Sequence, residues 1–112
     1  MKERVLFLCT GNSARSQMAE AILRVYGGGR FEVHSAGLSP RPINHLAVEA
    51  MQEMGIDISS QKSKDVKTYL GNVRFNYVVT LCHEAEQQCP HLFVGALHSK
   101  RQIATTLRLV RQ

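Results

Sequence analysis

The chain has 112 residues, which suits one domain with a single hydrophobic core. Hydrophobic residues make up 44% of the sequence, as in globular proteins, and no apolar run approaches the roughly 18 residues of a membrane span. The formal net charge is +5, but residues 90–112 hold four basic residues and no acidic one, so the rest of the chain is nearly neutral. Because no basic stripe is interleaved with aromatic residues, the sequence does not favour binding to nucleic acid.

The three cysteines are an odd number, whereas a secreted disulfide framework usually has an even number. The apolar stretch at residues 5–8 is also shorter than the about 7–15 residues of an export signal. We therefore expect a cytoplasmic protein whose thiols are buried, metal-bound or reactive.

The elements predicted in chain order alternate between strand and helix. They are a strand at 5–8, a helix at 15–26, a strand at 31–36, a helix at 46–54, a short helix at 65–70, a strand at 77–81 and a helix at 83–88. This order predicts an α/β fold, a three-layer α/β/α arrangement with a small parallel sheet. Met18, Met51 and Met54 are expected in its core. Ligands of such sheets lie beyond the carboxyl ends of the strands, where Cys9 and Cys82 both fall.

The loop after the first strand carries the chemistry. The loop leads into a helix N-terminus, and its backbone N–H groups predict an anion cradle there. The helix dipole there favours a thiolate at Cys9, Arg15 can hold a tetrahedral oxyanion through two parallel hydrogen bonds, and Ser16 can donate to the thiolate. These residue types predict nucleophilic attack on a phosphate-like oxyanion. The expected oxyanion-binding residues are Thr10, Gly11, Asn12, Ser13, Ala14 and Arg15. The alternative is that Cys9 is a small buried residue at a strand end.

Several segments up to Pro90 together resemble a known family. They are CTGNSARSQMAE at 9–20, SAG at 35–37, GIDI at 55–58, VVTLC at 78–82 and CP at 89–90. The chain resembles the low-molecular-weight tyrosine phosphatases and, more narrowly, the thioredoxin-coupled arsenate reductases built on that fold.

The resemblance implies a relay of three cysteines. Cys9 attacks arsenate bound by the loop and Arg15, Cys82 then attacks and releases arsenite, and Cys89 takes over the bond to Cys82. Thioredoxin reduces the last disulfide, and no cofactor is implied. If residues 83–88 are helical, Cys82 and Cys89 lie about 10 Å apart along the helix axis, and a disulfide needs Cα atoms within about 7 Å. The helix would therefore have to open when the pair oxidises.

Three other interpretations stay open. Cys82, Cys89 and His91 would bind zinc together with Cys9 or His83, although the cysteine spacing is not the usual one for zinc, and we expect no metal. Glu20 is expected on the polar face of the first helix. In some relatives the residues at positions corresponding to Asn12, Glu20, Ser35 and Asp65 bind potassium; solvated surface groups are the other interpretation of these four residues.

The end of the chain departs from the family. Relatives carry an Asp-Pro loop whose aspartate acts as general acid, but this sequence has no acidic residue after Glu86. A change of reading frame after about residue 90 would explain this basic end, and the coding DNA tests that hypothesis. We expect one domain over 1–112, with an atypical tail at 90–112 whose strand and helix are incomplete or altered. The alternatives to a reductase are a protein tyrosine phosphatase and an oxyanion-binding remnant without activity.

Overall fold

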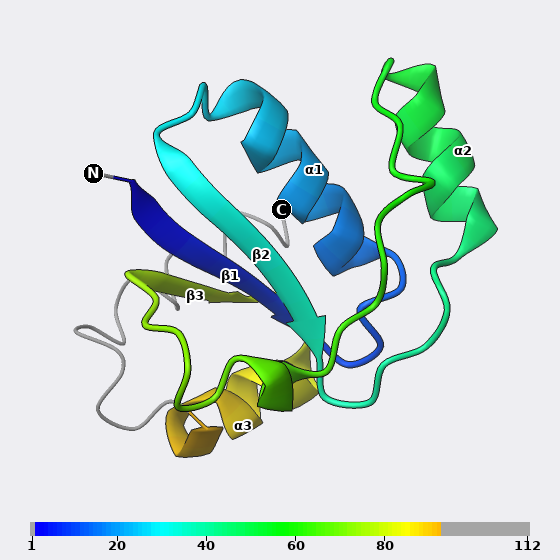
Figure 1. Cartoon of the computed structure of the whole chain (residues 1–112). Coiled ribbons are helices and arrows are strands. Elements are labelled where there is room, and N and C mark those ends of the chain that lie inside the picture. The colour runs from blue at the N-terminus through cyan, green and yellow to red at the C-terminus, as the bar shows by residue number, and fades with distance from the viewer. Residues whose placement is uncertain (1, 93–112) are drawn as a thin grey trace.

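The computed structural model describes residues 2–92, apart from the side chains of residues 86 and 89–92. Strands and helices alternate along this part of the chain in the order predicted from the sequence (Figure 1). The elements are β1 (Glu3–Cys9), α1 (Arg15–Tyr26), β2 (Phe31–Gly37), α2 (His45–Glu53), the 3-10 helix η1 (Val66–Thr68), β3 (Tyr77–Thr80) and α3 (His83–Leu92). The strand and helix expected in the tail at 90–112 fall at or beyond the end of this range.

The sheet is parallel, with the strand order β2-β1-β3. Cys9, the last residue of β1, pairs with Gly37, the last residue of β2, and Leu8 pairs with Thr80 of β3. The three strands therefore end at one edge, where the loop after β1 begins. The expected α/β class is confirmed.

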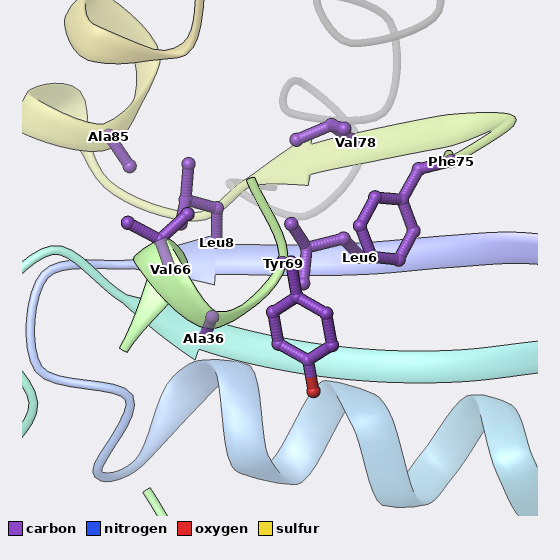
Figure 2. Close-up of a cluster of buried hydrophobic side chains, with 8 residues drawn as sticks. All are labelled: Leu6, Leu8, Ala36, Val66, Tyr69, Phe75, Val78 and Ala85. Atoms are coloured by element: carbon purple, nitrogen blue, oxygen red, sulfur yellow. The ribbon is translucent and has the colours of Figure 1, made fainter. Parts of the chain in front are cut away.

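The central strand is buried on both faces, as its unbroken apolar sequence predicts. On one face its side chains meet η1, α3 and the chain between η1 and β3 (Figure 2). On the other face, Val5 and Phe7 pack with Val33, Val79 and Leu81 beneath Ala19 and Leu23 of α1. The cluster in Figure 2 consists of Leu6, Leu8, Ala36, Val66, Tyr69, Phe75, Val78 and Ala85.

Helix α2 packs on α1 rather than on the sheet, through a third cluster that includes Ala21, Ala47 and Met51. Met51 is fully buried and Met18 packs against the same cluster, as expected. The prediction for Met54 is wrong, because its side chain is 52% exposed. Met54 follows the last turn of α2, where the chain leaves the helix through Gly55 at a positive φ of 79°.

No helix among the described residues is long and apolar enough to cross a membrane.

Replacing Leu6 by alanine should destabilise the fold by about 2–5 kcal/mol, because Leu6 is fully buried in the central strand and a cavity would remain. Urea unfolding followed by circular dichroism measures the change. Leu46→Ala is the matched control, since Leu46 is 62% exposed, and it should change the free energy of unfolding by less than about 0.5 kcal/mol. Equal losses in the two variants would contradict the assignment of the core.

Candidate active site

The loop between β1 and α1 turns its carbonyl groups outward. Backbone N–H groups of residues 38–44 bind four of them, and side chains bind the carbonyl of Asn12. The backbone bonds run from Leu38 N to Cys9 O (3.1 Å), from Ser39 N to Thr10 O (2.8 Å), from Arg41 N to Gly11 O (2.9 Å) and from Asn44 N to Ser13 O (2.8 Å). Gln17 Nε2 (3.0 Å) and Ser63 Oγ (2.9 Å) donate to Asn12 O.

The backbone N–H groups of residues 11–14 donate to no other residue within the part of the chain that the structure describes. The first turn of α1 likewise has no side-chain cap at Ala14. Uncapped N–H groups at a helix N-terminus are a ready site for an anion. These N–H groups are placed where the sequence predicts an anion cradle, and anion binding by them stays a prediction.

Asn12 is the conformational pivot of this loop. It is fully buried and has a positive φ of 50°, which asparagine tolerates better than most residues. Its Nδ2 donates to Ser16 Oγ (2.8 Å) and to Ser35 Oγ (2.9 Å), and its Oδ1 accepts from Lys64 N (2.8 Å). The side chain thereby ties the loop to α1, β2 and the chain before η1.

Gly37 allows the end of β2 to approach the loop. A Cβ atom at this position would lie 2.7 Å from Thr10 O and 2.9 Å from Asn12 N, too close for either backbone atom. Sequence reasoning used this glycine as the end of a strand and as part of a family pattern, but missed its contact with the loop.

Cys9 and Cys82 come together at this edge of the sheet, and neither forms a disulfide. Cys9 is buried, and Cys82 is partly exposed. Cys82 Sγ lies 3.2 Å from Thr10 Oγ1, and Ala85 N in the first turn of α3 donates to it (3.4 Å). The second thiol therefore sits at the N-terminus of a helix and beside the first residue of the anion loop.

This position favours the thiolate form of Cys82. Partial burial by itself would raise the pKa of Cys82, but hydrogen bonds from the Thr10 hydroxyl, the Ala85 amide, the Cys9 thiol and the Thr10 amide outweigh it and lower the pKa. A thiolate is the reactive form of cysteine, and a helix N-terminus stabilises it. The sequence assigned Thr10 to oxyanion binding only; the structure adds a contact with the second thiol.

Arg15 and Ser16 begin α1, the first exposed and the second buried. Arg15 Nη1 donates to the carbonyl of Leu81 (2.9 Å), so the guanidinium lies at the end of β3 next to Cys82, with other N–H groups left for an anion. Ser16 is fully buried, and its Oγ accepts from Asn12. The hydroxyl hydrogen of Ser16 is not used in that bond, which leaves its predicted donation to the Cys9 thiolate as an expectation.

Cys89 lies on α3, and its side chain is outside the described part of the structure, as is that of His91. Among the described side chains, no three histidine, cysteine or acidic residues lie together as metal ligands.

Glu20 is not a solvated residue of a polar helix face, so that expectation is wrong. It is 4% exposed, accepts from Ser35 Oγ, and pairs with Arg24 (2.6 Å) and Lys64 (3.5 Å). Ser35 and Asn12 are also fully buried, which excludes solvated surface groups for three of the four residues compared with a potassium site. A cation bound at Glu20 Oε1 would compete with the Lys64 ammonium.

An apolar groove among the described residues does not coincide with the two thiols. It has a volume of about 620 Å³ and runs along α1, with Arg15 and Leu81 among its lining residues. Large apolar pockets are the default place for a ligand. Here the reactive thiols and the uncapped N–H groups point instead to the loop at the sheet edge.

Gly37→Ala should destabilise the fold by about 1–3 kcal/mol, because the new methyl group collides with backbone atoms on both sides. Gly11→Ala is a matched control in the same loop, since its Cβ atom would meet only side-chain atoms at 3.4 Å or more. Chemical denaturation of both variants measures the difference. Loss of stability in Gly11→Ala alone would contradict the assigned contact.

Thr10→Val should raise the pKa of Cys82, because it removes the hydroxyl bond that favours the thiolate. Alkylation of Cys82 by iodoacetamide, followed across pH by mass spectrometry of its peptide, should then begin at higher pH than in the parent protein. Thr68→Val, the same change at an exposed residue of η1, should leave the profile unchanged. An unshifted profile in Thr10→Val would argue against the contact.

Comparison with known proteins agrees with this geometry. The family model described as low molecular weight phosphotyrosine protein phosphatase matches residues 4–108. An arsenate reductase of Shouchella clausii is 46% identical over 101 residues, covering 90% of this chain and 70% of the relative. Arsenate reductase 2 of Bacillus cereus is 46% identical over 89 residues, covering 80% of this chain and 66% of the relative. The chain thus spans about two thirds of the length of these curated relatives.

Solved structures give the same family. The structure titled as an arsenate reductase in the phosphate binding state is 38% identical, with a TM-score of 0.66, and the match covers 71% of this chain and 60% of that one. The YwlE arginine phosphatase of Geobacillus stearothermophilus is 28% identical, with a TM-score of 0.72, and the match covers 84% of this chain and 62% of that one. The chain therefore belongs to the low molecular weight phosphotyrosine protein phosphatase family and, within it, to the branch of the arsenate reductases.

Proposed function

We propose that the protein reduces arsenate to arsenite with electrons from its own thiols. The observation that carries the proposal is the second thiol: Cys82 lies beside Thr10 of the anion loop, and its pKa is lowered there. Hydrolysis of a phosphate ester needs one nucleophilic thiol, whereas reduction of arsenic by two electrons needs two thiols that can join. The similarity to arsenate reductases supports the same assignment.

The first step uses the anion cradle. Arsenate binds at the N–H groups of residues 11–14 and at Arg15; the related arsenate reductase in a phosphate binding state supports a site for a tetrahedral anion. The Cys9 thiolate attacks the arsenic atom, a sulfur–arsenic bond forms, and one arsenate oxygen leaves as water after protonation.

The second step uses Cys82. Its thiolate attacks the sulfur of Cys9, a Cys9–Cys82 disulfide forms, and the electron pair of the sulfur–arsenic bond passes to arsenic, which leaves as arsenite. Cys89 then attacks Cys82, so that a Cys82–Cys89 disulfide forms and the Cys9 thiolate is released. A dithiol reductant, for which we propose thioredoxin, returns the pair to two thiols.

The formation of the Cys82–Cys89 disulfide, which is the third step, requires a change in α3. Cys82 precedes this helix and Cys89 lies within it, so seven residues of helical rise separate them by about 10 Å along the axis. A disulfide between them needs a shorter Cα distance. The helix observed with free Cys9 and Cys82 therefore has to open on oxidation.

We also propose that the protein works in the cytoplasm, because free thiols need a reducing compartment. We propose further that residues 1–112 act as one domain.

A tyrosine phosphatase is the second candidate, because Cys9 and Arg15 would serve both reactions and phosphatases share the fold. Against it stands Cys82, a second thiol beside the anion loop whose pKa is lowered there, because hydrolysis has no use for it.

The test is arsenate-dependent oxidation of NADPH in the presence of thioredoxin and thioredoxin reductase. Cys82→Ser should abolish arsenate turnover but spare any hydrolysis of p-nitrophenyl phosphate, because only reduction needs the second thiol. Cys9→Ser should abolish both reactions. Arsenate turnover that survives in Cys82→Ser would contradict the relay, and a protein that binds phosphate but turns over neither substrate would be the inactive remnant.

A further inference from the structure

We infer that Gln17 and Gln61 are positioning residues that hold the anion loop in its binding conformation. The inference deepens the proposed function and rests on its oxyanion site. Neither side chain is among the residues assigned to the chemistry. Gln17 is fully buried on the first turn of α1, and Gln61 is half-buried in the chain before η1.

The orientation of the Gln17 amide follows from its partners. Lys64 N is a backbone donor, so the atom of Asn12 that it meets is the acceptor Oδ1. Gln17 contacts the same Oδ1 at 3.0 Å and must present its Nε2 there. That nitrogen also meets two carbonyl oxygens, those of Asn12 and Lys62, each at 3.0 Å. All three contacts demand a donor.

Gln61 completes the arrangement from the other side. Its Nε2 donates to Gln17 Oε1 (2.7 Å) and to Gln17 O (3.2 Å). With Oε1 held by this donor, the plane of the Gln17 amide is fixed, and its Nε2 stays directed at Asn12. The two glutamines form a chain of donors that runs from the surface to the pivot of the loop.

The consequence for function comes through Asn12. Its left-handed backbone is the point at which the loop turns its carbonyls outward. Gln17 contacts both the side chain and the carbonyl of this residue. If Asn12 relaxes to an ordinary backbone conformation, the N–H groups of residues 11–14 no longer converge on one anion. A loss of the Gln61 donor should thus weaken anion binding in a protein that is still folded.

The experiment uses the full chain with inorganic phosphate as the probe. The dissociation constant is measured from the protection of Cys9 against iodoacetamide, with Cys9 followed by mass spectrometry of its peptide. Gln61→Met removes the donor without adding charge, and Gln61→Glu adds an acceptor that faces Gln17 Oε1. At a temperature well below the melting temperature of each variant, we expect phosphate to bind about tenfold more weakly in both.

The matched controls are Gln52→Met and Gln52→Glu on the exposed surface of α2, which should bind phosphate like the parent. A purely structural role of Gln61 would lower the melting temperature but leave the phosphate affinity of the folded protein within about twofold, and this result would overturn the inference. If only Gln61→Glu bound phosphate more weakly, the added charge would explain the change, and the inference would again be overturned. The inference would also be overturned if phosphate did not protect Cys9 of the parent protein.

The same protein preparations separate this inference from the proposed function. If the parent binds phosphate and the Gln61 variants bind it weakly, the positioning role stands even when no variant reduces arsenate. If arsenate is reduced and the Gln61 variants bind phosphate normally, the reductase stands and the positioning role fails.

Discussion

The site depends on one constraint: the carbonyl groups of residues 9–13 are all bound from outside the loop. A peptide group that turns its oxygen outward directs its N–H to the opposite side. Donors from residues 38–44 supply four of these bonds, and Gln17 of α1 and Ser63 before η1 supply those to the carbonyl of Asn12. The anion cradle is thus made of backbone, but its shape is imposed by two segments that follow β2 and α2.

The second thiol depends on the same edge of the sheet. Because β1 and β3 are parallel neighbours, Cys9 at the end of β1 and Cys82 just after β3 lie at the same edge of the sheet. Helix α3 begins directly after Cys82, and its first turn donates to the sulfur. Ala85 anchors this end by packing on the sheet (Figure 2). Gln87 and Gln88, one turn later, are exposed. A helix of ten residues is marginal without such packing, so the contact of Ala85 stabilises the end of α3 near Cys82.

The sequence predicts most of the fold because its local signals agree. Apolar runs marked the strands, helical spacing marked α1 and α2, and the parallel arrangement placed Cys9 and Cys82 at one edge, as observed. It failed where a polar side chain is buried by a partner distant in sequence. Glu20 has the local pattern of a surface residue, and only Ser35 and Lys64 explain its burial. Gln17 and Gln61 lie 44 residues apart and carry no local signal of their contact.

The choice between hydrolysis and reduction is made beside the loop rather than within it. In the proposed function, the loop and Arg15 bind a tetrahedral anion, and phosphate and arsenate share that shape. Thr10 is the residue at which the two parts meet, because it belongs to the cradle and its hydroxyl lies against Cys82 Sγ. An anion bound at the loop therefore lies next to a thiol with a lowered pKa. That thiolate can attack Cys9 only after Cys9 has bonded to an atom able to accept two electrons. Arsenic in arsenate is such an atom and phosphorus in phosphate is not, so in the proposed function an arrangement that binds both anions would reduce only one.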